Sequence, residues 1–587
     1  MRTIESLQEA IRRERKQREA FSGTDWLTRI RAGHAQQALQ DLIFFTTPEH
    51  FLSCVGLLQH EIRNKFEISS EEIQECDLRL LAELVLALCS FLPRWNLQST
   101  ERHGSAALTD AQLKTTADTF LSLIGELSVR APALAEKLLV SWRAETLARL
   151  KAERAEDPSG EAQALVGNSI REYLANVGVA LAHSHLRRMA EMRSVGETMT
   201  ELSNDYATFL QYALYLGASF VTCNPPLIDI AWTTDPERWN PVVDEIIASH
   251  PDVDDDALAR WVTLEIVLTN MRLLRPIFLL TEGRMGCVSL QVNPKKHGDA
   301  ETMIRDAQSI YDELTNRLEG GVPNVVFKLP GTQAGLTACS TLTKQGIGVN
   351  ITVNFALFQH LPFAQVIAEG RAIFSCLAHM SGRLAFPVRD ELLAKLDELA
   401  TCGISEAQAR GAAAWSGVAV LKRLHRLLTE RGYDLTRIKP LVASLRIYEG
   451  DGYESLPSIS PDITETLGTS ILSVFPNIRR TFDALAQLTL DPRRVESPVP
   501  ALILETLAHS EIFKQAYYVP SEDGDSGLWQ PDRPLILQDE DGTAAWVPVR
   551  NTLTEFNNSY DAFVQRILER KRAVLPKKRE SKAVLAQ

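Results

Sequence analysis

The chain has 587 residues, of which 45% are apolar and 23% charged, enough for two or three domains with a sizeable core. Its 62 lysine and arginine residues are outnumbered by 75 aspartate and glutamate residues, and this net charge of −13 argues against a general affinity for nucleic acid or for an anionic membrane. Eight widely spaced cysteines without a CxxC pair, and the absence of any run of 18 apolar residues, predict reduced thiols in a cytoplasmic protein that spans no membrane.

Residues 1–195 predict helices almost throughout. Apolar residues recur at three- and four-residue spacing, as in LAELVLALCSFL (81–92), and the charged N-terminus lacks the apolar core of a signal peptide. His183 and His185 have no evident third ligand, so a solvated helix face is favoured over a metal site. These helices could pack on the following domain, form a homodimer or bind a partner protein.

From about residue 199, short apolar runs alternate with helical segments. Six runs predict buried parallel strands, at 218–223, 286–292, 324–328, 348–353, 372–378 and 440–445. With a first strand before Asp205 and a last one near 456–460, the count reaches eight βα units. The predicted fold is therefore an α/β protein, a (β/α)8 TIM barrel over residues 196–520 preceded by a helical region over 1–195.

Residues 521–587 predict an acidic loop, a helix and a basic tail. The stretch 520–542 is rich in proline and acidic residues, which is typical of a surface loop. An amphipathic helix is expected over 556–574. The basic end, PKKRESK (576–582), is expected to be a solvated tail rather than a nucleic-acid patch.

Lys328 ends the apolar run NVVFK and precedes leucine, proline and glycine. At the C-terminal end of a barrel strand, burial disfavours the ammonium form and can supply a neutral amine near pH 7. Such an amine adds to a ketone and forms a Schiff base, an electron sink for breaking the adjacent carbon–carbon bond. The alternative is a lysine that extends to solvent or neutralises a carboxylate.

The order of six segments favours the chemical interpretation. They are VTCNPPLI (221–228), SLQVNP (289–294), VVFKLPGTQAGL (325–336), GIGVNITVNFALFQ (346–359), LAHMSGRL (377–384) and LVASLR (441–446). In this order they resemble the successive strand-end motifs of the transaldolase family, which are class I Schiff-base enzymes on an eightfold barrel. A weaker likeness follows at HSEIFKQAYYVP (509–520), so the resemblance covers about residues 199–520.

The resemblance implies transfer of a dihydroxyacetone unit between sugar phosphates such as fructose 6-phosphate, erythrose 4-phosphate and sedoheptulose 7-phosphate, as in the pentose phosphate pathway. It implies no metal and no other cofactor. Lys328 would be the Schiff-base lysine, and Asp205, 19 residues before Asn224, the proton-transfer group. Thr352 would hold the catalytic water together with Gln291.

The same resemblance assigns substrate contacts. Thr222, Asn224 and Asn350 would contact substrate hydroxyls or the lysine. Arg383, Ser444 and Arg446 would bind phosphate, and two guanidinium groups that grip a phosphate bidentately make physical sense in an acidic protein.

Several positions depart from the family pattern. Typical transaldolases carry glutamate where this chain has Gln291, and an amide can hold a water but cannot act as a base. Glutamine there is similar to the fructose-6-phosphate aldolase branch, but that branch has a tyrosine where this chain has Met380. His379 could substitute, or could be a structural histidine, and Ala378 replaces a serine. Asp205 lacks the usual following threonine or serine and could instead start an exposed helix.

Two alternatives therefore stay open beside a transaldolase. One is an aldolase that releases the three-carbon fragment. The other is a catalytically impaired barrel that serves as an interaction scaffold, with the N-terminal helices binding a partner.

Overall fold

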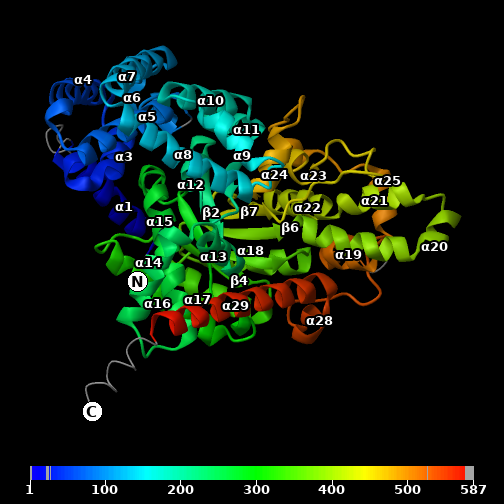
Figure 1. Cartoon of the computed structure of the whole chain (residues 1–587). Helices are drawn as coiled ribbons and strands as arrows, with labels where there is room; N and C mark the ends of the chain where they lie inside the picture. The colour runs from blue at the N-terminus through cyan, green and yellow to red at the C-terminus, as the bar shows by residue number, and fades with distance from the viewer. Residues whose placement is uncertain (1–2, 21–25, 27, 91, 525–526, 576–587) are drawn as a thin grey trace.

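The computed structural model describes residues 3–20, 26, 28–90, 92–524 and 527–575. Eight parallel strands close into a barrel in chain order, each paired with the next and β8 with β1. Strands β2, β4, β6 and β7 are labelled in Figure 1. They are β1 (Glu201–Asn204), β2 (Ala218–Cys223), β3 (Cys287–Gln291), β4 (Val325–Pro330), β5 (Val349–Asn354), β6 (Ser375–Met380), β7 (Ile438–Ala443) and β8 (Ile471–Val474). The predicted (β/α)8 barrel is thus confirmed.

The six strands predicted from apolar runs are present within three residues at each end, and the first strand, expected before Asp205, is β1. The eighth predicted strand, near 456–460, was wrong, because these residues form an irregular connection. The last strand of the barrel is instead β8, at Ile471–Val474. The backbone N–H of Tyr448 donates to the carbonyl of Ile459, which folds this connection back on itself, and Pro461 then begins a short helix. Only after Gly468, at φ +105°, does the chain turn into the fully buried ILSV segment.

Helices pack around the barrel. After β1 come α12 (Leu210–Tyr215), α13 (Pro225–Thr234), α14 (Pro236–Ser249), α15 (Asp255–Leu280), η5 (Pro294–Lys296), α16 (Ala300–Arg317), α17 (Gln333–Lys344) and α18 (Leu357–Glu369). After β6 come α19 (Ser381–Ala394), α20 (Leu396–Thr401), α21 (Glu406–Ala414), α22 (Ser416–Glu430), α23 (Pro461–Thr464) and α24 (Pro476–Asp483).

The segment beyond the barrel is mostly short helices and one long one. They are η6 (Arg494–Glu496), α25 (Ala501–Leu507), α26 (Glu511–Tyr517), α27 (Pro520–Asp523), α28 (Glu540–Ala545) and α29 (Val547–Val574). The predicted final helix is α29, which packs against α13, α14, α15, α19 and β5. Within the predicted loop over 520–542, the described residues between α27 and α28 (524 and 527–539) are irregular, and the basic end 576–582 lies outside the described residues.

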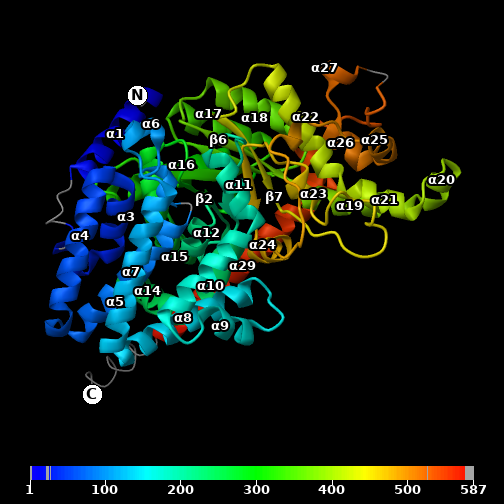
Figure 2. The ribbon, with the colours of Figure 1, turned by 90° about the horizontal axis from the view of Figure 1, so that it is seen from above.

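The helical region before the barrel is confirmed and forms a layer of its own, blue to cyan in both views (Figures 1 and 2). Its elements are α1 (Ile4–Glu19), η1 (Ile30–His34), α3 (Ala35–Phe45), α4 (Pro48–Lys65), η2 (Phe66–Ile68), α5 (Glu71–Cys89), η3 (Leu92–Trp95), α6 (Thr100–His103), η4 (Gly104–Ala106), α7 (Asp110–Arg130), α8 (Pro132–Ala152), α9 (Pro158–Val166), α10 (Ile170–His183) and α11 (His185–Ser194). Threonine and serine side chains cap α1, α4, α5 and α7.

Buried and partly buried polar contacts join this layer to the barrel. Arg275 on α15 donates to Glu14 on α1, and Arg479 on α24 pairs with Glu153 at the end of α8. The Ser184 hydroxyl donates to Asp483 at 2.7 Å. The N-terminal helices therefore pack on the barrel and share its apolar core, while a homodimer or a partner protein stays a prediction.

Three further expectations concern membrane-spanning helices, disulfides and the two histidines of the N-terminal region. The described helices include none long and apolar enough to cross a bilayer. The eight cysteines form no disulfide within the described ranges. The solvated histidine face was wrong for His185, which is buried, bonds the Leu485 carbonyl through Nε2 at 2.7 Å and packs edge-on against Phe482.

Candidate active site

Lys328 lies on β4 near the C-terminal end of the barrel, two residues before the strand ends. In register it pairs with Gln291 of β3 on one side and Asn350 of β5 on the other. Its side chain is 7% exposed, so the ammonium form loses most of its hydration. Burial lowers the pKa of Lys328, and the negative charge of Asp205 opposes this shift only in part.

Asp205 follows β1 directly, so the structure places it at the barrel and not at the start of an exposed helix. Its backbone N–H donates to the Val474 carbonyl of β8, and its carboxylate accepts from the Thr222 hydroxyl of β2. Burial raises the pKa of Asp205, while the Lys328 charge and the Thr222 hydrogen bond act in the opposite direction. The amine and the carboxylate therefore influence each other directly.

Hydroxyls inside the barrel extend this contact. Ser473 of β8 lies 3.1 Å from the Thr222 hydroxyl and donates to Ser203 of β1 at 3.1 Å. The interpretation of the sequence missed both serines. Ser473 could have been identified as a small polar residue within the short apolar segment ILSV. A polar side chain inside a barrel needs a hydrogen-bond partner there.

Polar side chains flank the lysine on β3 and β5. Asn350 is fully buried and donates to the Ser289 hydroxyl at 2.8 Å, which leaves its Oδ1 without a protein partner. The Oε1 of Gln291 is likewise buried and unpartnered. The Thr352 hydroxyl contacts the Met380 sulfur at 3.7 Å. Two open acceptors thus lie in the same register row as the amine, a setting that suits a bound water or a substrate hydroxyl.

Asn224 follows β2 and begins α13. Its side-chain oxygen accepts from the Leu227 backbone N–H at 3.0 Å, as an N-cap residue does. The side chain is half-buried and lies at the same end of the barrel as Thr222. Its cap role fixes the side chain, and its amide nitrogen can still donate elsewhere.

Arg383 and Arg446, together called the arginine pair below, follow β6 and β7 respectively. Gly382 brings them together, because a Cβ at this position would overlap the Arg446 side chain and the Ser444 carbonyl. Ser444 itself has a left-handed backbone, φ +60°, and its carbonyl accepts from the Arg446 guanidinium at 3.2 Å. Burial lowers the pKa of Arg446, and the charge of Arg383 lowers it further.

Asp462 of α23 positions Arg446. The interpretation of the sequence did not identify Asp462. Its carboxylate is fully buried and accepts from the Arg446 backbone N–H at 2.9 Å and from the Ser381 hydroxyl. Burial raises the pKa of Asp462 to about 6. Both arginines also act on the charge of Asp205, so the arginine pair and the Lys328 amine belong to one end of the barrel.

His379 faces away from this centre. It alternates along β6 with Met380, whose sulfur meets Thr352, and its Nδ1 instead lies 3.2 Å from Nε2 of His360 on α18. Both histidines are fully buried, and burial lowers the pKa of His379 to about 4. His379 is thus a neutral group between the strand and its helices.

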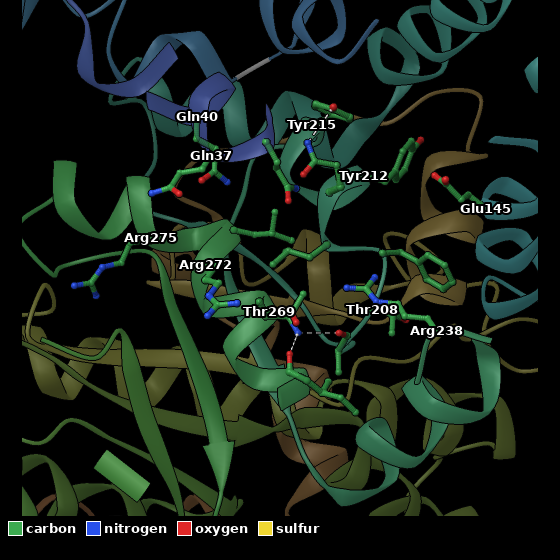
Figure 3. A pocket seen from close by; sticks show the side chains of 18 of the residues that line it. Gln37, Gln40, Glu145, Thr208, Tyr212, Tyr215, Arg238, Thr269, Arg272 and Arg275 are labelled. Carbon is green, nitrogen blue, oxygen red and sulfur yellow. Dashed lines mark hydrogen bonds between the residues drawn. The ribbon is translucent and has the colours of Figure 1, made fainter. Parts of the chain in front are cut away.

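A cavity of about 1650 Å³ lies elsewhere, between the N-terminal layer and the barrel. Figure 3 shows Gln37 and Gln40 of α3 opposite Arg272 of α15, with Thr208 of the β1–α12 loop below. Lys328 and Asp205 do not line it. The cavity is thus separate from the barrel end, which carries the buried Lys328 amine, the Asp205 carboxylate and the arginine pair.

Among the described residues, no cluster of three or more histidine, cysteine, aspartate or glutamate side chains could hold a metal ion. The groups at the barrel end are an amine, hydroxyls, amides and guanidinium groups. This set fits covalent chemistry on a carbonyl compound with an anionic group.

Comparison with known proteins relates the barrel to one family. Residues 205–491 match the family described as Transaldolase/Fructose-6-phosphate aldolase. The chain is 31% identical to a transaldolase of Mycolicibacterium smegmatis over 150 residues, 26% of this chain and 38% of the relative. It is 31% identical to one of Thiobacillus denitrificans over 173 residues, 29% and 42% of the two chains, and 26% identical to one of Frankia alni over 284 residues, 47% and 72%. The chain thus spans only about two fifths of the length of the first two relatives.

Proposed function

Because residues 205–491 form a domain of the transaldolase/fructose-6-phosphate aldolase family, we propose that this protein transfers a dihydroxyacetone unit between sugar phosphates through a Schiff base on Lys328. The observation that carries the proposal is the buried Lys328 amine, whose pKa is lowered by burial, beside the Asp205 carboxylate. A neutral amine at this place is costly for stability and useful for attack on a ketone.

In the proposed reaction, the Lys328 nitrogen adds to the ketone carbon of a ketose phosphate, and water leaves to form the Schiff base. Asp205 accepts the proton of the C4 hydroxyl as the C3–C4 bond breaks and the first aldehyde departs. The three-carbon unit stays on the nitrogen as an enamine until an acceptor aldehyde arrives. Bond formation returns the proton, and hydrolysis releases the new ketose and the free lysine.

The other polar groups take supporting roles. Gln291 and Thr352 would hold the water used in Schiff-base formation and hydrolysis, since the Gln291 oxygen has no protein partner. Thr222 orients Asp205 through its hydroxyl. Asn224 and Asn350 would contact substrate hydroxyls, and the arginine pair with Ser444 would bind the distal phosphate.

Trapping tests the proposal directly. The protein is incubated with fructose 6-phosphate, reduced with borohydride and analysed by mass spectrometry. We expect a three-carbon adduct on Lys328, its loss in Lys328→Met, and its retention in Lys344→Met, which removes an exposed lysine on α17. Absence of the adduct in the folded wild-type protein with this and related ketose phosphates would refute the proposal and favour a scaffold.

A second candidate activity is release of the three-carbon unit as free dihydroxyacetone, as in an aldolase. Gln291 favours it, because an amide next to the lysine cannot serve as the base that glutamate supplies in typical transaldolases. Product formation with and without erythrose 4-phosphate separates the two. Without the acceptor, a transferase releases at most one equivalent of the first aldehyde per protein and no free dihydroxyacetone, whereas continuous release of dihydroxyacetone without the acceptor supports the aldolase.

A further inference from the structure

The last long helix places a carboxylate on the arginine pair. Glu555 of α29 accepts from Arg383 through both oxygens, from Nη1 at 2.5 Å and from Nη2 at 2.6 Å. This two-bond geometry is the one in which a guanidinium group also grips a phosphate. Glu555 lies outside residues 205–491, the part of the chain that matches the family.

The charges around Glu555 come from both arginines. Hydrogen bonds from Arg383 lower the pKa of Glu555, and the charge of Arg446 lowers it further, so the carboxylate is ionised at neutral pH. In the free protein Glu555 therefore neutralises part of the positive charge that Arg383 and Arg446 share. Any anion that binds the arginine pair has to compete with it.

The packing of α29 shows which part of this contact can move. Phe556, the next residue, is 4% exposed and lies under the Arg383 guanidinium at 5.6 Å, so it anchors the helix. The Glu555 side chain is 54% exposed, whereas that of Arg383 is 20% exposed. A rotation of the Glu555 side chain into water can thus free the guanidinium group while α29 stays docked.

We propose that Glu555 is a specificity-determining residue, an internal carboxylate that the distal phosphate of the substrate must displace from the arginine pair. A phosphate dianion brings two negative charges to two guanidinium groups, and the carboxylate brings one. Displacement is favourable for the dianion, whereas a neutral or singly charged distal group gains little over Glu555. The inference rests on the proposed function for the identity of the substrate, and it assigns the basis of phosphate selection to this residue.

Glu555→Gln tests the competition, because it keeps the shape of the side chain and removes its charge. The matched control is Glu569→Gln, which removes one charge from an exposed position of the same helix. Calorimetry with inorganic phosphate as the probe is expected to show binding about 10-fold tighter in Glu555→Gln and unchanged in Glu569→Gln. With substrates, KM for fructose 6-phosphate is expected to fall about 10-fold in Glu555→Gln with kcat unchanged, while KM for fructose stays the same.

The two readouts separate this inference from the proposed function. Unchanged or weaker phosphate binding in Glu555→Gln overturns the role of Glu555, even where Lys328 is trapped by fructose 6-phosphate. Tighter phosphate binding with no adduct on Lys328 supports the competition and refutes the sugar-transfer chemistry.

Discussion

Replacing Asp205 with asparagine removes a negative charge that acts directly on the Lys328 amine. Asp205 is the largest influence that raises the pKa of Lys328 against the effect of burial. Without this charge the ammonium form is less stable, so the pKa of Lys328 falls further and the amine is neutral at lower pH. An opposite charge within about 4–6 Å shifts a pKa by about 1–3 units. Taking the lower part of this general range, we expect the pH midpoint of Schiff-base formation to shift by ~1–2 units, which corresponds to ~1.4–2.7 kcal/mol of lost stabilisation of the ammonium form.

The assay is borohydride trapping with fructose 6-phosphate at a series of pH values, read by the mass of the protein. The midpoint of adduct formation is expected to move to lower pH by ~1–2 units in Asp205→Asn. It is expected to stay in place in Asp451→Asn, which removes an exposed carboxylate. Loss of proton transfer lowers the yield of adduct but does not move its midpoint. A midpoint that stays unchanged, or moves to higher pH, in Asp205→Asn would contradict the reasoning.

Three further changes have expected outcomes. Gln291→Glu adds a carboxylate in register with Lys328 and should move the trapping midpoint to higher pH by ~1 unit, and an unmoved midpoint would show that the new charge does not reach the amine. Burial raises the pKa of Glu83 to about 7, so the folded protein holds an extra proton between about pH 4.5 and 7 and loses stability as pH rises through this window. Glu83→Gln should remove that loss and raise the free energy of unfolding by ~1–3 kcal/mol at pH 8 but little at pH 4, as measured by thermal unfolding. An equal effect at both pH values would exclude titration of Glu83 as the cause. Lys439→Met leaves Glu201, 3% exposed, without its ion pair and should cost ~3–5 kcal/mol, most of which the double variant with Glu201→Leu recovers.

The strand positions could be predicted because a buried parallel strand is a short apolar run with no polar face. β8 could not, since its four residues ILSV are shorter than the other runs and the preceding connection, with its prolines and serines, offered a competing segment. Lys328 drew attention as a charged residue at the end of an apolar run, but the run alone left open a lysine that extends to solvent, and only the order of the six segments favoured the chemical interpretation.

The contacts that complete the barrel end were beyond the sequence, because they depend on how distant segments meet. Glu555 is 172 residues from Arg383, and Asp462 is 81 residues from Ser381. Each of these carboxylates is an ordinary acidic residue of a helix until the fold brings it to its partner. The half-buried position of Asp205 likewise depends on the pairing of β1 with β8. The sequence of β1 alone does not show this pairing.

Translation delivers the eight strands before it delivers α29. A nascent chain can therefore close its barrel before Glu555 is available to pair with Arg383. Until α29 docks, the positive charges of Arg383 and Arg446 repel each other at the C-terminal end of the barrel.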